Sequence, residues 1–465
     1  MGILRNNFKK RVINTKIIFI VPTSAIRRNP IYRFGSLIYG HSNSITGPLI
    51  LGKILKDKGH DVEVYEELYN TLDFNKFLDA DIIMLYTMTS NSTRAYEIGD
   101  YFKSKNKKVV IGGMHASGVP EEAIKHADQV VVGEAEKVIS DIAEGKITDK
   151  IVYSPYVENL DEIPFPDYTL LKTPCSAANV MTSRGCPFSC IFCTTSRMFH
   201  PYRKRSPDNV IEELRLYKKL GFKYVNFEDD NFTADKDRAK EILRKMIENN
   251  LVFKETFFFG RTDMANDEEL LDLLHRAHLN RVLVGIESLN QESLDYINKK
   301  QKISDIEECA AALLKHKIKL IASIVLGLDT DNQEDIKRSV NFCKNINAYQ
   351  LQPAILTPYP KTPLYEQLVK ENRMLDNDWE SFDMMVVNFV PKKMSPWDLQ
   401  NEFFHAVKSF YSFASSFKIF KYFGFDAGMR RLGLWIASLL GNLGFKIASK
   451  THNGNIYNKL KEISN

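Results

Sequence analysis

Residues 179–193 read NVMTSRGCPFSCIFC, so that a short apolar run leads directly into a loop with three cysteines. Residues 179–183 are typical of a buried strand, and Gly185 and Pro187 break that strand before the next helix. In parallel α/β proteins, the binding sites lie beyond the carboxyl ends of the strands. The stretch therefore predicts an α/β fold that carries a metal centre on a strand-end loop.

Cys186, Cys190 and Cys193 have the spacing C-x3-C-x2-C. Thiolates are preferred ligands of iron-sulfur clusters, and a cubane held by three cysteines leaves its fourth iron open to another ligand. Zinc is an alternative, but it usually takes four ligands, and only His200 is a nearby candidate for the fourth. Chance clustering of structural cysteines is a further alternative. The spacing favours a [4Fe-4S] cluster whose open iron takes part in chemistry.

The cysteine triplet resembles the defining motif of the radical S-adenosylmethionine (SAM) enzymes. This resemblance implies that the amino and carboxylate groups of SAM chelate the open iron. It also implies reductive cleavage of SAM to a 5'-deoxyadenosyl radical, with a reductant such as ferredoxin or flavodoxin. Phe192, which lies between the last two cysteines, is assigned to the SAM site on the same basis.

The length and composition of the chain restrict its class. With 465 residues it can form two or three domains, and its 44% apolar and 26% charged residues are close to globular averages. A net charge of +5 and a basic run limited to residues 9–11 give no case for a nucleic-acid partner. We expect a cytoplasmic protein, because the N-terminus lacks a signal-peptide pattern and the other cysteines show no pairing rhythm.

Residues 16–144 alternate apolar strand segments with helical patterns, including an amphipathic stretch at 48–58 that Gly59 closes. This alternation predicts a doubly wound parallel sheet with helices on both faces. Ligands bind such sheets beyond the carboxyl ends of the strands. Those ends carry hydroxyl, glycine, imidazole and carboxylate groups: Thr89, Ser90, Gly112, Gly113, His115, Gly133 and Glu134.

Three segments of this region, at residues 47–60, 112–115 and 132–136, resemble the cobalamin-binding domain that is fused to many radical SAM proteins. The resemblance implies bound cobalamin at the seven strand-end residues named above. Residues 22–28 replace the Asp-x-His-x-x-Gly motif of other cobalamin domains, which implies a cobalt without a protein imidazole. A nucleotide-type sheet domain with ordinary glycine turns, or a relic that binds nothing, remains an alternative.

From residue 178 the strand and helix rhythm resumes with six strand segments, which predicts a partial (β/α)6 TIM-like barrel. We place the cobalamin-binding-like domain at 12–145 and the barrel at 178–385. Residues 146–177 are predicted to be a linker, because Pro164 and Pro166 disfavour a helix there. Residues 386–465 are predicted to form a helical C-terminal region.

An acidic segment, EDDN at 228–231, follows the second barrel strand. Its carboxylates would repel one another unless they face solvent, a cation or an amine. The resemblance places contacts with the SAM amino group at Glu228 and Asp229, although the family's Gly-Gly-Glu form is absent. The alternative is a solvated turn in which Asp230 or Thr233 caps the following helix.

Later strand ends carry the remaining SAM candidates. Glu287 and Ser288 match a family pattern near the SAM ribose and carboxylate, and a buried Glu otherwise needs a partner. Arg261 can bind the SAM carboxylate as a bidentate fork, or pair with Glu228 or Asp263. Gly327 would let the backbone approach adenine.

From Trp397 onward, Phe, Lys and small residues predominate, and helical spacing gives an aromatic face and a basic face. Residues 433–448 fall short of the roughly 20 apolar residues of a membrane span. The tail is either a helical subdomain packed on the barrel mouth or an interfacial segment. On the basis of its two faces we predict peripheral membrane contact.

The leading hypothesis is a cobalamin-dependent radical SAM enzyme that methylates an unactivated carbon of a small-molecule or lipid-like, apolar substrate. One alternative is a radical SAM cyclase or rearranging enzyme without net methyl transfer, like the anaerobic cyclase of chlorophyll synthesis. An alternative from another class is a non-catalytic iron-sulfur redox sensor. No individual catalytic residue is assigned from the sequence.

Overall fold

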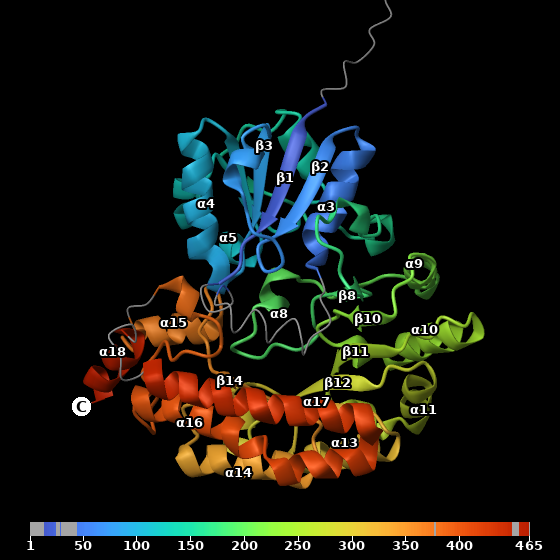
Figure 1. Cartoon of the computed structure of the whole chain (residues 1–465), viewed down its shortest axis with the longest axis vertical. Coiled ribbons are helices and arrows are strands. Elements are labelled where there is room, and N and C mark those ends of the chain that lie inside the picture. The colour runs from blue at the N-terminus through green and yellow to red at the C-terminus, as the bar shows by residue number, and fades with distance from the viewer. Residues whose placement is uncertain (1–13, 25–27, 29–43, 376–377, 449–454, 465) are drawn as a thin grey trace, which may run out of the picture.

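The computed structural model describes residues 14–24, 28, 44–375, 378–448 and 455–464. Within these residues, two parallel sheets of six strands each lie in the upper and lower halves of Figure 1. The arrows of β1 (Lys16–Val21) and β2 (Asp61–Glu66) point down toward the second sheet. The carboxyl ends of the first sheet, where ligands bind parallel sheets, therefore face the second half of the molecule.

The first sheet has the strand order β2-β1-β3-β4-β5-β6, and every pairing is parallel. Neighbouring residues of β1 face opposite sides, so that Ile17 belongs to one buried cluster and Ile18 to the other. Burial on both faces explains why these strands read as continuous apolar runs. The other strands are β3 (Ile82–Tyr86), β4 (Lys108–Gly112), β5 (Gln129–Val132) and β6 (Ile151–Tyr153).

Helices cover both faces of this sheet, as the alternating sequence pattern predicts. The helix expected at 48–58 is confirmed as α3 (Thr46–Asp57), and Gly59 follows it with a φ of 93°. The other helices of this half are α4 (Ser92–Ser104), α5 (Met114–Gly118), α6 (Pro120–Ala123) and α7 (Ile139–Ala143). Residues 146–177, which the sequence predicts to be a linker, also supply β6 to the sheet.

The second sheet has the order β14-β13-β12-β11-β10-β7, in which chain neighbours are also sheet neighbours and all pairs are parallel. This order, with a helix after each of β10 to β13, forms the predicted partial (β/α)6 barrel. Its strands are β7 (Ala177–Val180), β10 (Tyr224–Phe227), β11 (Glu255–Gly260), β12 (Arg281–Glu287), β13 (Lys319–Leu326) and β14 (Gln350–Ile355). Its helices are α9 (Pro207–Lys219), α10 (Lys236–Glu248), α11 (Glu268–Arg276), α12 (Gln291–Tyr296), α13 (Ile303–Lys315), α14 (Gln333–Asn345) and α15 (Pro363–Lys370).

A small antiparallel hairpin frames the cysteine loop. It pairs β8 (Ser183–Arg184) with β9 (Arg203–Lys204), and the short helix α8 (Thr195–Met198) lies between them in the chain. The loop with the three cysteines therefore begins and ends on a fixed base directly after β7.

The C-terminal region is helical, as predicted. Helix α16 (Pro396–Phe410) packs against α14 and β14, and Leu399 and Phe403 join the barrel core. Helix α17 (Phe413–Ala448) has a kink at Gly424, and α18 (Asn455–Ser464) packs on α16. In Figure 1 these helices lie along the barrel, away from the first sheet. Among the described residues, no helix has the length and apolar character that crossing a membrane requires.

Candidate functional site

The cysteine loop is held against the barrel by the segment that follows α12. The backbone N–H of Ile191 donates to the carbonyl of Ile297 over 3.2 Å, and Nδ2 of Asn298 donates to Oγ of Ser189 over 2.9 Å. Sγ of Cys190 lies 4.0 Å from the carbonyl oxygen of Asn298. Contacts on both sides of Cys190 thus fix the position of its thiol.

Of the three cysteines, Cys190 is buried while Cys186 and Cys193 are partly exposed. Burial raises the pKa of the Cys186 thiol, and charges on Cys193 and Cys190 raise it further. Bound cations would relieve this cost, because thiolates are stabilised by metal ions. In the described part of the chain, no three His, Cys, Asp or Glu side chains form a site for a metal ion by themselves. A donor set of three thiols with no fourth protein ligand does fit a cluster with one open iron.

His200, the candidate fourth zinc ligand, lies exposed at the end of this loop. Phe192 is partly buried and packs against the barrel core. Its assignment to a SAM site stays a prediction.

Asp229 anchors the strand that leads to the cysteines. Its buried carboxylate accepts hydrogen bonds from Oγ1 of Thr182 over 2.7 Å, from the N–H of Thr182 over 3.2 Å, and from Oγ of Ser183. Burial raises the pKa of this carboxyl group. The observed partners give Asp229 a structural role at the base of the loop, and its predicted contact with SAM stays a prediction.

Glu228 points toward the first sheet domain. Its Oε2 accepts a hydrogen bond from Oγ1 of Thr46, at the start of α3, over 3.3 Å. Burial raises the pKa of Glu228 to about 7. The carboxyl group thus lies between the two domains, and its predicted contact with the SAM amino group stays a prediction.

The cap proposed for the next helix is wrong. Helix α10 begins after Asp235, whose side chain accepts from the N–H of Arg238, and neither Asp230 nor Thr233 has that position. A short 3-10 turn at Phe232–Ala234 delays the start of the helix.

Glu287 has the partner that a buried carboxylate requires. Nζ of Lys299 lies 2.5 Å from its Oε1, and both side chains are more than nine-tenths buried. Arg261 does not pair with Glu228 or Asp263: its guanidinium lies 3.8 Å from the ring centroid of Phe188 and donates to the carbonyl of Lys299. Arg261 therefore braces the cysteine loop.

Two further SAM candidates also have protein contacts. Oγ of Ser288 donates to Oδ2 of Asp331 over 3.1 Å. Gly327 has a φ of 90°, and a Cβ there would lie 2.5 Å from Cδ2 of Leu399 on α16. The absence of a side chain at Gly327 is thus needed for helix packing, and contacts of both residues with SAM stay predictions.

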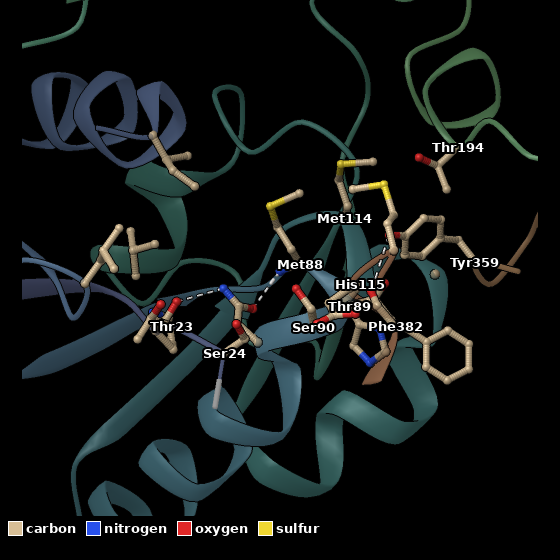
Figure 2. Close-up of a pocket in the computed structure, with 18 of the residues that line it drawn as sticks. Thr23, Ser24, Met88, Thr89, Ser90, Met114, His115, Thr194, Tyr359 and Phe382 are labelled. Carbon is tan, nitrogen blue, oxygen red and sulfur yellow. Dashed lines mark hydrogen bonds between the residues drawn. The ribbon is translucent and has the colours of Figure 1, made fainter. Parts of the chain in front are cut away.

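A cavity of about 380 Å³ lies where the two domains meet (Figure 2). Thr89, Ser90 and His115 line it from the first sheet, and Thr194 lines it from the position next to Cys193. Figure 2 shows Tyr359 and Phe382, from the end of the barrel, at the same space. Methionines complete the lining: Met88, Met114, Met198, Met384 and Met385.

His115 is buried and forms part of the wall of this cavity. Neither of its ring nitrogens makes a hydrogen bond to the described residues, although Nε2 lies 3.7 Å from Oε1 of Glu122. The ring of Trp379 packs edge-on against the imidazole, with 5.0 Å between ring centroids. A buried polar group without a hydrogen bond is costly, so this position suits a ligand with polar atoms.

A second cavity, of about 320 Å³, extends along the strand ends beside α3. Gly47, Gly112, Gly113 and Gly133 all line it. An added Cβ at Gly112 would meet no atom closer than 4.0 Å, so the space beside Gly112 is open. This second cavity forms a cradle over the carboxyl ends of the first sheet, a position that suits a cofactor such as cobalamin.

Glu134 links this cradle to the cysteine loop. Its carboxylate lies 3.2 Å from Nη1 of Arg184, pairs with Arg203, and accepts the N–H of Val157 over 2.9 Å. Arg184 also pairs with Glu136 at 2.5 Å. The predicted cobalamin contact of Glu134 stays a prediction, whereas its ion pairs join the first sheet to the β8–β9 hairpin.

Sequence reasoning missed several residues of this site. Lys299 and Phe382 are distant in sequence from the motifs that they contact or face. Met88 precedes Thr89, and Met114 lies within the segment 112–115, but only their polar and glycine neighbours were singled out there. Tyr359 lies in a Pro-rich loop that closes the barrel.

Comparisons with known proteins agree with this architecture. The model of the radical SAM superfamily matches residues 180–343, and the model of the B12 binding domain matches residues 46–143. A domain of unknown function, DUF4070, matches residues 362–431. The last match includes Phe382, α16 and the start of α17.

Two curated relatives are similar over most of the chain. An uncharacterized methyltransferase of Pyrococcus horikoshii is 28% identical over 79% of this chain and 86% of the relative. The bacteriochlorophyllide d C-12(1)-methyltransferase of Chlorobaculum tepidum is 28% identical over 80% of this chain and 84% of the relative. Among solved structures, the cobalamin-dependent SAM radical enzyme OxsB has a TM-score of 0.66 at 15% identity, covering 90% of this chain and 72% of OxsB. The likeness to OxsB is one of fold.

Proposed function

Because this chain is a radical SAM enzyme whose barrel follows a B12-binding domain, we propose that it methylates an unactivated carbon of an apolar small molecule. One observation carries the proposal. The cavity of about 380 Å³ is lined both by Thr194, next to Cys193, and by Thr89 and His115 of the first sheet. A substrate in this cavity would be in reach of both halves of the molecule, as a reaction with two reactive groups requires.

Each cofactor has residues that fit it. Cys186, Cys190 and Cys193 would hold the [4Fe-4S] cluster, and the glycine-lined cradle would hold cobalamin. We assign SAM to the barrel ends beside the cluster, near Phe192, Glu287 and Ser288. When bound, the cluster and SAM supply a 5'-deoxyadenosyl radical and cobalamin carries the methyl group.

The lining of the shared cavity supports an apolar substrate. Aromatic and methionine side chains form its walls on the barrel side, including Tyr359, Phe382, Met384 and Met385. Methionine side chains adapt to irregular apolar shapes, and apolar walls keep water from reactive species. The relative from Chlorobaculum tepidum is named for methylation of a bacteriochlorophyllide.

The test uses the full chain after anaerobic reconstitution with iron, sulfide and hydroxocobalamin. With dithionite as the reductant and SAM as the substrate, we expect 5'-deoxyadenosine from the wild type and none from Cys190→Ala. Cys175→Ala is the matched control, because Cys175 lies outside the loop and should leave the yield unchanged. Equal yields of 5'-deoxyadenosine from Cys190→Ala and the wild type would contradict the assignment of a radical SAM reaction to this cysteine loop.

Methyl transfer is tested separately from radical formation. With an apolar tetrapyrrole or lipid substrate, a methyltransferase yields S-adenosylhomocysteine together with 5'-deoxyadenosine. A cyclase yields 5'-deoxyadenosine without the homocysteine product. An ultraviolet-visible spectrum that shows no bound corrin after reconstitution would contradict the cobalamin assignment.

A further inference from the structure

The outward face of α17 is unusually apolar. Of sixteen exposed large apolar side chains among the described residues, nine belong to this one helix. They include Phe417, Phe425, Met429, Ile436, Leu440 and Leu443. From Phe425 onward their spacings of three, four and seven residues place them on one side of the helix. The apolar residues thus form a continuous strip along the outside of the protein.

The inward face of the same helix carries buried polar groups. Ser416, Arg431, Ser438 and Asn442 are buried there, together with the apolar Ile419 and Ala427. The half-buried Leu434 and Trp435 pack against the barrel core, and Phe423 packs against the cluster of Tyr349, Ile419 and Ala427.

The polar inward residues are bonded to the barrel and its helices. Arg431 donates to the carbonyl of Tyr349 and lies 4.1 Å from the ring centroid of Phe410. Nδ2 of Asn442 donates to the carbonyl of Phe404 over 3.2 Å. These contacts fix which side of α17 faces outward.

A helix on a water-soluble surface exposes a polar face, whereas the exposed face of α17 is apolar. Exposed apolar patches of this extent mark surfaces that meet another molecule or a membrane. We therefore expect the apolar strip to contact an apolar environment.

The charges beside the strip indicate which kind of apolar environment it contacts. Lys418 and Lys421 are exposed next to Phe417 and Tyr422, while Asp426 is the only acidic residue of α17. Aromatic side chains flanked by lysines match the boundary between acyl chains and anionic headgroups. A second copy of the chain seated symmetrically on Phe417 would instead bring its lysines against Lys418 and Lys421, which costs free energy.

We propose that α17 docks this protein on the surface of an anionic lipid bilayer. The helix lies in the plane of the interface, with Phe417, Phe425 and Leu440 among the acyl chains and Lys418 and Lys421 at the headgroups. The kink at Gly424, where φ is 84°, joins the two parts of the strip. The proposal depends on the surface of α17 alone and holds whichever reaction the enzyme catalyses.

The test is flotation of the reconstituted full chain with vesicles of phosphatidylcholine, with or without phosphatidylglycerol. We expect the wild type to float with the anionic vesicles and to bind the neutral ones at least about tenfold more weakly. The variants Lys418→Glu/Lys421→Glu and Phe417→Ser/Phe425→Ser/Leu440→Ser should each lose flotation. Both change exposed positions and should leave the yield of 5'-deoxyadenosine unchanged.

Matched controls alter exposed residues of the first sheet domain. Lys58→Glu/Lys150→Glu reverses two exposed charges, and Tyr153→Ser removes an exposed ring. Both should float like the wild type. Failure of the wild type to float, or equal loss in the controls, overturns the proposal. So does a wild-type dimer in light scattering that the triple serine variant converts to a monomer, because the strip would then be an interface between copies.

Discussion

Nζ of Lys299 lies 2.5 Å from Oε1 of Glu287, in an ion pair buried beside the cysteine loop. A Cβ at Gly285 would overlap both charged groups, so the pair explains why glycine precedes Glu287 by two positions. Burial raises the pKa of the Cys190 thiol, while the charge of Lys299 acts in the opposite direction. The pair therefore contributes to the electrostatic environment of the loop as well as to its support.

The variant Lys299→Met should lower the free energy of unfolding by about 3 to 5 kcal/mol, because it leaves a buried carboxylate without its cation. Urea denaturation measures the change. The exposed neighbour Lys300→Met is the control and should cost less than about 0.5 kcal/mol. The double variant Lys299→Met/Glu287→Gln should recover part of the loss, and a purely additive result would contradict the pairing.

Gly113→Ala should destabilise the first domain and weaken binding of hydroxocobalamin. Gly113 has a φ of 107°, and an added Cβ would lie 2.7 Å from the backbone nitrogen of Thr87. Gly145→Ala is the matched control, since its φ is 72° but nothing lies within 4 Å of its Cβ position. We expect a cost of about 1 kcal/mol at Gly145 and at least about 2 kcal/mol more at Gly113. Equal losses in the free energy of unfolding for the two variants would contradict the close contact between Gly113 and Thr87.

Glu228 should make stability depend on pH. Burial raises its pKa to about 7 in the folded protein, above the ordinary value of 4.5 for a glutamate side chain. The carboxyl group therefore favours the folded state at low pH, and this contribution is lost as the pH rises through 7. Relative to Glu228→Gln, the wild type should lose up to about 3 kcal/mol between pH 4.5 and pH 8. A constant difference across that range would show that Glu228 titrates normally.

Glu255 should have the opposite pH dependence. Burial alone would raise its pKa, but Arg281, Lys319 and Arg430 lower it to about 2. The group therefore stabilises the fold above its unfolded pKa, and this contribution is lost as the pH falls toward 2. Glu255→Gln should cost about 3 kcal/mol at pH 7, and the cost should shrink between pH 5 and pH 3. Denaturation curves with a constant cost would contradict the assignment.

The strands that are long and apolar were predictable from the sequence, and so was the cysteine loop. Strand β6 was not, because Ile151–Tyr153 has three residues and only the middle one is buried. Strands such as β7 and β10 can be predicted from their apolar sequence. Strand β6, in contrast, depends on its pairing with β5. Such pairing is a tertiary effect that a short segment does not encode by itself.

Side-chain partners were harder to predict than strands. The sequence predicts a buried partner for Glu287, but nothing in it indicates Lys299, which lies three residues beyond the end of α12. The acidic segment at 228–231 suggested a shared site, yet Glu228 and Asp229 face different neighbours, Thr46 and Thr182. Adjacent residues at a strand end point to opposite sides, and sequence alone does not say what lies on each side.

The C-terminal tail shows the same limit. The sequence predicts an aromatic face and a basic face, but a periodic pattern does not reveal which face turns inward. Buried Arg431 and Asn442 decide this in the structure, through bonds to the carbonyl groups of Tyr349 and Phe404. The outward position of the apolar face of α17 therefore follows only from its contacts with the barrel.

The wall that Tyr359 and Phe382 give to the shared cavity is made late in protein synthesis. More than 250 residues separate Thr89, on the opposite wall, from Tyr359. The first sheet ends at Tyr153, and about 200 residues follow before Tyr359. At roughly 5 to 20 residues per second, the complete first domain has roughly 10 seconds or longer on the ribosome before Tyr359 is added. During that interval the Thr89 side of the shared cavity lacks its opposite wall. A ligand can therefore reach the strand ends of the first domain more freely in the nascent chain than in the finished protein.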